Sequence, residues 1–211
     1  MADNFLENRY EEVFGNGKKN IKKIGHGLDT LLEKNRSVRG YNKNIEVSQQ
    51  ILEKIVAVNT KIPSARNQQI LRFKLVTKNT GAEKIIENIK LGGALPELNL
   101  PFPETEPEAF IIVCSKIEPT NYVYIDLGIS LQSMLLKAVE IGFNGIIIGA
   151  FNEKNITEAF NLKYKPLAVL AIGKSIEKIE LVKITENESH NYYRKNGVHY
   201  VPKLGVESLL M

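Results

Sequence analysis

AFIIVCSKIEPTNYVYIDLGISLQSMLLKAVEIGFNGIIIGAF, residues 109–151, places two short apolar runs on either side of one long helical pattern. Residues 109–115 and 145–151 have the length and β-branched composition of buried strands. Between them, residues 122–142 carry a polar stripe that steps by four and three residues, and nearly all the other residues are apolar: the stripe is Asp126, Ser130, Ser133, Lys137 and Glu140. A helix that is apolar on most sides must be enclosed, either by its own domain or by a partner.

The flanking sequence supplies further helices and strands. Helical spacing predicts helices over 4–14, 19–34, 48–59, 82–91 and 157–162, and β-branched runs predict strands over 71–77, 167–173 and 198–201. This order predicts a sheet with helices packed on its faces, although spacing alone does not fix how the strands pair. Four of the eight prolines fall between Pro96 and Pro107. We therefore expect residues 92–108 to form a long irregular loop that covers a site.

Composition bounds the class of protein. The 211 residues are 43% apolar and 25% charged, which is typical of one globular domain with or without an appendage. A net charge of +4 is lower than is typical of a nucleic-acid-binding protein, but it suits the binding of an anionic small ligand. The single cysteine, Cys114, allows no internal disulfide and fits a reducing compartment, the cytoplasm. We expect no signal peptide, because residues 1–19 lack an apolar core, and no membrane span.

Residues 35–41, NRSVRGY, are the first segment that could carry chemistry. The guanidinium groups of Arg36 and Arg39 and the hydroxyl of Ser37 can bind a phosphate through charge-assisted hydrogen bonds. The alternative is that these basic residues only complement the dipole at the end of a helix.

Two more segments have polar or small residues in suitable positions. Residues 63–69, PSARNQQ, could read the edge of a flat heterocycle through amide and backbone groups, or could be a capped loop before a strand. Residues 149–152, GAFN, could let backbone N–H groups approach a ligand, or could be a tight turn. The three histidines have no metal-ligand spacing, and there is no hydrolase triad motif or dinucleotide-binding glycine motif.

Taken together, these segments resemble the nitroreductase-like FMN-dependent oxidoreductase family. NRSVR at 35–39 looks like the family's R-R-S-x-R, and PSARNQQ at 63–69 fits P-S-x-x-N-x-Q. DLGISLQ at 126–132 is similar to the family's long central helix, and GAFN at 149–152 resembles the loop after it. The match runs from about residue 31 to 173, so residues 1–30 are expected to be a helical extension and 31–211 the FMN-binding domain.

The resemblance implies an α+β fold around a mainly antiparallel sheet flanked by helices. It also implies an intertwined homodimer with FMN at the subunit interface. The long helix would pack in that interface, and the C-terminal segment would reach over the partner. The alternative for the long helix is a core helix of a monomer.

The resemblance also implies roles for residues. Arg36 and Ser37 would contact the FMN phosphate, and Arg39 would sit near the pyrimidine edge of the ring, where a cation stabilises reduced flavin. Lys203 would be a second phosphate contact. The remaining predicted contacts divide between a loop of the partner subunit that lines the flavin and a turn near flavin N5: Pro63, Ser64, Ala65, Asn67 and Gln69 in the loop, and Gly149 and Ala150 in the turn.

The implied activity is a ping-pong oxidoreductase. NADH or NADPH would reduce the flavin, and an electron-poor acceptor such as a nitroaromatic or quinone would reoxidise it, with no catalytic side chain required. Two departures from the motifs stand out: Asn35 replaces the first Arg, and Ile70-Leu71 replaces the usual Pro-Trp. They keep two alternatives open, an enzyme acting on flavin or a halogenated phenol, and a catalytically silent FMN-binding module.

Overall fold

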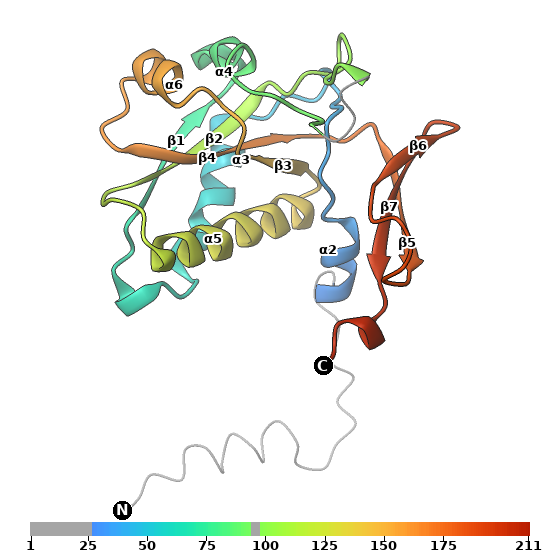
Figure 1. Cartoon of the computed structure of the whole chain (residues 1–211). Coiled ribbons are helices and arrows are strands. Elements are labelled where there is room, and N and C mark those ends of the chain that lie inside the picture. The colour runs from blue at the N-terminus through green and yellow to red at the C-terminus, as the bar shows by residue number, and fades with distance from the viewer. Residues whose placement is uncertain (1–26, 94–97) are drawn as a thin grey trace, which may run out of the picture.

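A four-stranded antiparallel sheet forms the centre of the molecule (Figure 1). The computed structural model describes residues 27–93 and 98–211, so the helix predicted over 4–14 and the first part of that over 19–34 lie outside the described residues. The strands follow the spatial order β1-β2-β4-β3: β1 Leu71–Val76, β2 Ala109–Ser115, β4 Lys165–Gly173 and β3 Asn144–Ile148. Every pairing between them is antiparallel. The predicted α+β fold with an antiparallel sheet and flanking helices is confirmed.

Helices cover both faces of this sheet (Figure 1). On one face lie α3 (Gln49–Val56) and α5 (Asn121–Glu140), and on the other α4 (Ala82–Ile86) and α6 (Glu153–Phe160). β2 has no exposed residue because alternate side chains serve the two cores. Ile111 packs with Met134 of α5, whereas Phe110 packs with Ile156 of α6.

The long helix α5 begins at Asn121, directly after its N-cap residue Thr120. The Thr120 hydroxyl accepts a hydrogen bond from the Val123 N–H, as N-cap residues do. The predicted polar stripe divides along the helix. Asp126 and Ser130 are buried, whereas Lys137 and Glu140 form an ion pair near the C-terminal end.

The chain before the sheet runs along its β3 edge. After α2 (Leu28–Lys34), Ser37 forms a parallel bridge with Gly145, and the Val38 N–H donates to the Gly145 carbonyl at 3.1 Å. The Tyr41 ring lies on Gly173, where an added Cβ would come within 2.6 Å of it. The phenol of Tyr41 donates back to the Val38 carbonyl at 2.7 Å. Residues 37–41 are therefore fixed rigidly beside the sheet.

The last third of the domain adds a second, smaller sheet beside α2 (Figure 1). Its order is β5-β7-β6, with β5 Lys178–Ile184 parallel to β7 Val198–Leu204 and β6 Tyr193–Lys195 antiparallel to β7. The predicted strand over 198–201 is confirmed as part of β7. β5 and β6 were not predicted.

Two predicted helices have different bounds. The helix predicted over 82–91 ends at Ile86, because Ile89 forms a bridge with Phe151 and the Lys90 N–H donates to the Ala150 carbonyl. The helix predicted over 157–162 begins at Glu153, because the Asn152 side chain caps it. Short 3-10 turns complete the described chain at η1 Ala57–Thr60, η2 Ala65–Asn67, η3 Lys78–Thr80 and η5 Val206–Ser208. Among residues 27–93 and 98–211, no helix has the length and apolar character that crossing a membrane requires.

Candidate functional site

Arg36 and Ser37 point to different sides of the chain. The segment is extended at Ser37, where it bridges Gly145, and successive side chains of an extended segment alternate. The Arg36 guanidinium donates to the Leu32 carbonyl at 2.5 Å, one turn back in α2. Partial burial lowers the pKa of Arg36. Its position matches the helix-end alternative, whereas Ser37 is exposed on the other side.

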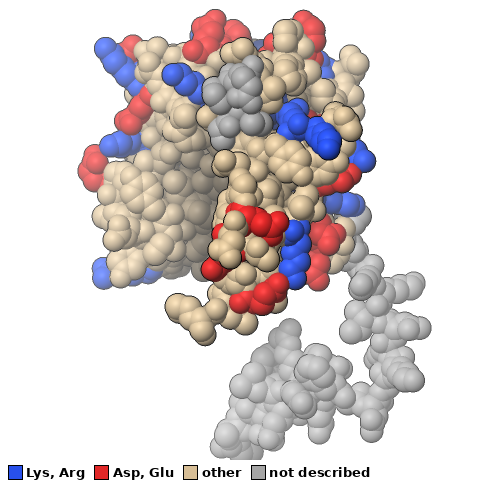
Figure 2. All heavy atoms as spheres, turned by 45° about the vertical axis from the view of Figure 1, so that its right-hand side comes forward, with Lys and Arg blue, Asp and Glu red and all other residues tan. Residues whose placement is uncertain are grey.

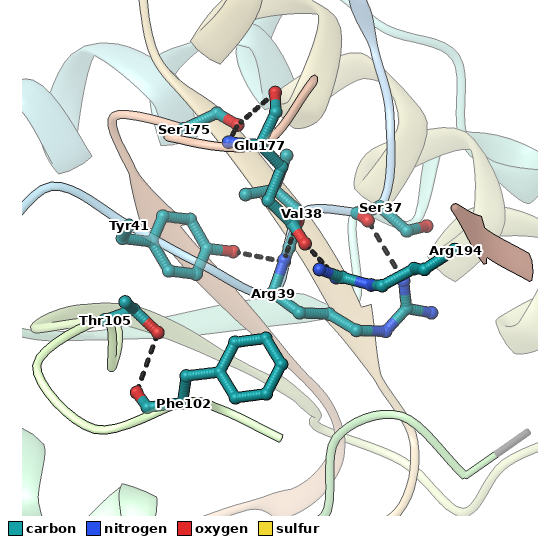
Figure 3. Close-up of polar contacts among 9 residues, drawn as sticks. All are labelled: Ser37, Val38, Arg39, Tyr41, Phe102, Thr105, Ser175, Glu177 and Arg194. Atoms are coloured by element: carbon teal, nitrogen blue, oxygen red, sulfur yellow. Dashed lines mark hydrogen bonds and ion pairs between the residues drawn. The ribbon is translucent and has the colours of Figure 1, made fainter. Parts of the chain in front are cut away.

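Arg39 is buried, with 9% of its surface exposed, and is fixed by both its backbone and its side chain. Its N–H donates to Glu177 Oε2 at 2.6 Å, and its guanidinium donates to the Ser37 carbonyl at 3.2 Å. The other oxygen of the same carboxylate accepts from Arg194, which reaches it from β6 (Figure 3). Glu177 thus joins the 37–39 segment to the C-terminal sheet.

The charges in this cluster do not balance. The Glu177 carboxylate accepts the Arg39 backbone N–H and the Arg194 guanidinium, whereas the Arg39 guanidinium donates to the neutral carbonyl of Ser37. Within the described part of the chain, the buried Nε atoms of both arginines have no hydrogen-bond partner, and neither has Nδ1 of His199. A buried charge is costly unless it is paired. The cluster therefore has an excess of positive charge that suits an anionic group.

Aromatic rings line one side of the cluster. The Tyr192 ring stacks on the His199 ring, with 5.1 Å between their centroids. The Arg39 guanidinium lies 5.0 Å from the centroid of the Tyr192 ring. Burial lowers the pKa of His199, and the nearby charges of Arg194 and Arg39 lower it further, whereas Glu177 opposes them. His199 is consequently neutral at pH 7.

The described part of the proline-rich loop meets this cluster. The Phe102 ring lies 5.8 Å from the Arg194 guanidinium, and 41% of Phe102 is exposed (Figure 3). The Tyr41 N–H donates to the Thr105 carbonyl at 2.9 Å, and Lys43 pairs with Glu106 at 2.6 Å. The described part of the loop, residues 98–108, is thus attached to the segment that carries Arg39.

The loop predicted to line the flavin, residues 63–69, lies near the N-terminal end of α5. The Ala65 N–H donates to Asp126 near the start of the helix, whereas Asn35 donates to Gln132 about 9 Å further along it. Figure 1 shows the chain around residue 65 at the N-terminal end of α5 and α2 beyond the opposite end. Within one subunit the structure therefore does not bring the loop to Ser37 and Arg39. This separation applies to all five residues of the loop that the sequence predicted as flavin contacts: Pro63, Ser64, Ala65, Asn67 and Gln69.

The turn at 149–150 is open to solvent. Both Gly149 and Ala150 are exposed, and an added Cβ on Gly149 would meet no atom within 4 Å. The Ala150 carbonyl accepts from the Lys90 N–H at 2.9 Å, and the Asn152 N–H donates to the Asn88 carbonyl at 2.8 Å. These bonds hold the turn against the 88–90 segment and leave its outer side accessible.

Lys203 is not part of the arginine cluster. It lies in β7 opposite Lys183 of β5, about 13 Å along the strand from His199, and its side chain is exposed. The basic residue that the C-terminal sheet brings to Arg39 is Arg194 instead.

Three residues were missed by the sequence analysis. Glu177 and Arg194 gain their importance from contacts across the fold, and no local motif contains them. Asp126 was noted as part of the polar stripe and of the helix motif at 126–132 but was given no role, and its hydrogen bond to Ala65 joins residues 61 positions apart. A buried carboxylate on an apolar helix is the one signal that could have identified it.

Comparisons with known proteins agree with the fold. The “Putative NAD(P)H nitroreductase YdgI” of Bacillus subtilis is 22% identical over 184 residues, covering 70% of this chain and 88% of that protein. A structure of “a putative nitroreductase in complex with FMN” from Exiguobacterium sibiricum superposes with a TM-score of 0.60 at 20% identity, covering 72% of this chain and 90% of that one. An FMN-dependent nitroreductase from Clostridium difficile R20291 gives a TM-score of 0.53 at 23% identity, covering 70% and 87%.

The fold and the cluster define the class: an α+β domain with a cationic site between its sheet edge and its C-terminal strands. More narrowly, the model of the nitroreductase family matches residues 32–174, and the chain belongs to that family of enzymes. The resemblance inferred from the four sequence segments is thereby confirmed.

Proposed function

We propose that the protein is an FMN-dependent oxidoreductase that takes electrons from NADH or NADPH and passes them to an electron-poor small molecule, such as a nitroaromatic or quinone. Family membership supports the class of reaction, and relatives described as an NAD(P)H nitroreductase and as binding FMN support the donor and the cofactor. The observation that carries the proposal is the pair of Arg39, which is buried, and Arg194, which is partly buried, beside the single carboxylate of Glu177.

The residues around this pair fit an FMN molecule. The Arg39 and Arg194 Nε atoms are buried donors without partners among residues 27–93 and 98–211, and FMN offers phosphate and carbonyl oxygens as acceptors. The exposed hydroxyl of Ser37 lies next to them, and the open turn at Gly149 and Ala150 leaves room for a flat ring. Bound FMN would accept a hydride from the nicotinamide and later give it to the acceptor.

Each group of residues has a distinct task in this proposal. Ser37 and Arg194 hold the phosphate of FMN. Arg194 supplies the positive charge that is missing because Asn35 stands where the family motif has its first arginine. Arg39 stabilises negative charge at the pyrimidine edge. Arg36 contacts the phosphate beside Ser37 only if its guanidinium turns from the α2 side of the chain to the side of Ser37. No nucleophile is required, and burial raises the pKa of the Cys114 thiol to about 11, which keeps it protonated.

The cofactor site is proposed to be shared between two subunits. The loop at 63–69 lies at the N-terminal end of α5, whereas α2, which leads into the 37–39 segment, lies beyond the opposite end (Figure 1), and a second copy that supplies the loop would bring both segments to one flavin. α5 also leaves Tyr122, Tyr124 and Ile125 more than half exposed, which is typical of an interface. Figure 2 shows a broad uncharged area next to the charged side chains of the C-terminal region. The apolar end at Leu209–Met211 is exposed and supports an arm that contacts the partner.

A spectral titration tests the proposal. Purified protein is titrated with FMN and then, without oxygen, with NADH and separately with NADPH, followed by a nitroaromatic or a quinone. We expect the flavin absorbance to bleach with one nicotinamide and to return with the acceptor. Protein that retains no flavin absorbance after unbound FMN has been removed contradicts the proposal. Bound FMN that neither nicotinamide reduces contradicts the assigned electron donor.

A further inference from the structure

The loop at 64–69 has an unusual backbone. Three of its residues, none of them glycine, lie in the left-handed region: Arg66 at φ 51°, Asn67 at φ 53° and Gln69 at φ 48°. Side chains with a Cβ rarely adopt this region, and asparagine is the only one of the three that tolerates it well. Such strain persists only where surrounding contacts hold it, and it concentrates at functional sites.

Local hydrogen bonds give the loop its shape but do not attach it to the rest of the fold. The Asn67 N–H donates to the Ser64 carbonyl at 2.9 Å, and the Gln69 N–H donates to the Ser64 hydroxyl at 3.2 Å. Among the described hydrogen bonds of residues 64–69, one reaches a distant element. It runs from the Ala65 N–H to Asp126 Oδ1 at 2.8 Å.

The surroundings of Asp126 explain why this bond matters. Its side chain is on the buried face of α5, and the residue is 5% exposed. Hollows flank the loop on both sides. One of about 510 Å³ is lined by Asp126 and Ser64, and another of about 690 Å³ by Asp126 and Ala65. Because the loop is not packed from either side, the carboxylate is its main restraint.

We propose that Asp126 is a positioning residue, which holds the 64–69 loop in its strained shape through the Ala65 N–H. The inference rests on the proposed function, in which this loop lines the flavin of the partner subunit. A buried carboxylate that accepts a backbone N–H forms a strong charge-assisted bond. The loop is thus held ready, with the exposed Asn67 presented outward, before the cofactor arrives.

Amide exchange and cofactor binding in matched variants test this role. Asp126→Ala removes the acceptor, Asp126→Asn keeps an oxygen in the same place, and Ser130→Ala removes a buried hydroxyl one turn along that contacts Asn59 instead. In FMN-free protein, we expect Asp126→Ala to speed exchange of the Ala65 amide about tenfold or more, the scale of one lost charged hydrogen bond. FMN affinity should fall about tenfold in the same variant. Asp126→Asn should recover most of both losses, and Ser130→Ala should resemble the wild type.

The outcomes separate this proposal from the proposed function. Folded Asp126→Ala protein with wild-type exchange at Ala65 and wild-type FMN affinity overturns it, as does an Asp126→Asn variant as impaired as Asp126→Ala. If Asp126→Ala does not fold, Asp126→Glu takes its place, since the flanking hollows accept one more methylene and the acceptor is displaced. Its expected result is faster exchange and weaker FMN binding, and wild-type values overturn the proposal. Wild-type protein that binds no FMN refutes the proposed function, while the exchange comparison still decides whether Asp126 holds the loop.

Discussion

At the scale of single residues, the segment 36–39 contributes two different chemistries. Arg36 faces back to α2 and a mixed-charge hollow of about 380 Å³, which Lys34, Glu140 and Lys174 also line. Arg39 faces the C-terminal sheet, where the Glu177 carboxylate accepts its backbone N–H and pairs with the Arg194 guanidinium. Spacing in the sequence placed both arginines in one cofactor site. It could not show their alternation, because that depends on the extended backbone beside Gly145.

Arg39→Ala is therefore expected to weaken FMN binding more than Arg36→Ala. Loss of a buried charged donor costs about 2 kcal/mol, whereas Arg36 gives up only a partly exposed contact with the end of α2. Isothermal titration or flavin fluorescence with both purified variants measures the difference. Equal losses, or a larger loss in Arg36→Ala, would show that Arg36 leaves the Leu32 carbonyl when the cofactor binds.

The lowered pKa of His199 leads us to expect that the stability of the folded protein depends on pH. The pKa of His199 is lowered in the folded protein by burial and by the facing guanidinium groups of Arg194 and Arg39, with Glu177 opposing them. Below about pH 6.5, the unfolded chain then binds a proton that the folded chain resists. Stability is therefore full above that pH and falls as the pH decreases toward the lower folded pKa.

Thermal unfolding between pH 7.5 and 5 checks this prediction. The wild type should lose midpoint temperature faster than His199→Gln as the pH decreases. The exposed His190 provides the control, and His190→Gln should follow the wild type. Parallel curves for all three proteins would be inconsistent with a buried neutral His199.

At the scale of elements, local signals predicted the main sheet and the long helix well. The helix predicted over 122–142 is α5, Asn121–Glu140, and the apolar run at 109–115 is β2 residue for residue. β5 and β6 have a weaker signal, because most of their residues are exposed or only partly buried and both strands pair through β7. α4 ends early for a similar reason: the bridge between Ile89 and Phe151 is a long-range contact that overrides helical spacing.

β3 allows a matched test of how the segment 36–39 is positioned. An added Cβ on Gly145 would lie 2.5 Å from the Ala171 carbonyl oxygen, a backbone atom that cannot move aside easily. Gly145→Ala should lower the free energy of unfolding by about 1–3 kcal/mol, as overpacking does, and should loosen Ser37 from the strand. Gly149→Ala meets no atom within 4 Å and should leave stability near the wild-type value. Chemical denaturation of both variants measures the contrast, and similar stabilities would be evidence against the close pairing at Gly145.

At the scale of the whole molecule, the sequence could single out candidate segments for the site but not how the fold arranges them. The segments around Ser37, Ala65 and Ala150 were all identified, yet the structure places them at separate points around α5 and β3. The basic residue from the C-terminal region is Arg194, not Lys203, at the Arg39 cluster. Sequence position could not distinguish the two, because only the pairing of β6 with β7 decides which side chain faces Arg39.

A second copy of the chain is the simplest way to bring these segments to one cofactor, and it predicts that assembly and FMN binding fail together. Ile125, which is 56% exposed on α5, is the test position, and Ile125→Glu would place a charge in the proposed interface. We expect this variant to sediment as a monomer and to lose most FMN affinity. Lys154→Glu on α6, exposed on the opposite face of the sheet, changes the surface charge without touching α5 and should remain a dimer that binds FMN. A monomeric Ile125→Glu protein with wild-type FMN affinity would place the whole site within one subunit, and the separation of the 63–69 loop from Arg39 would then need another explanation.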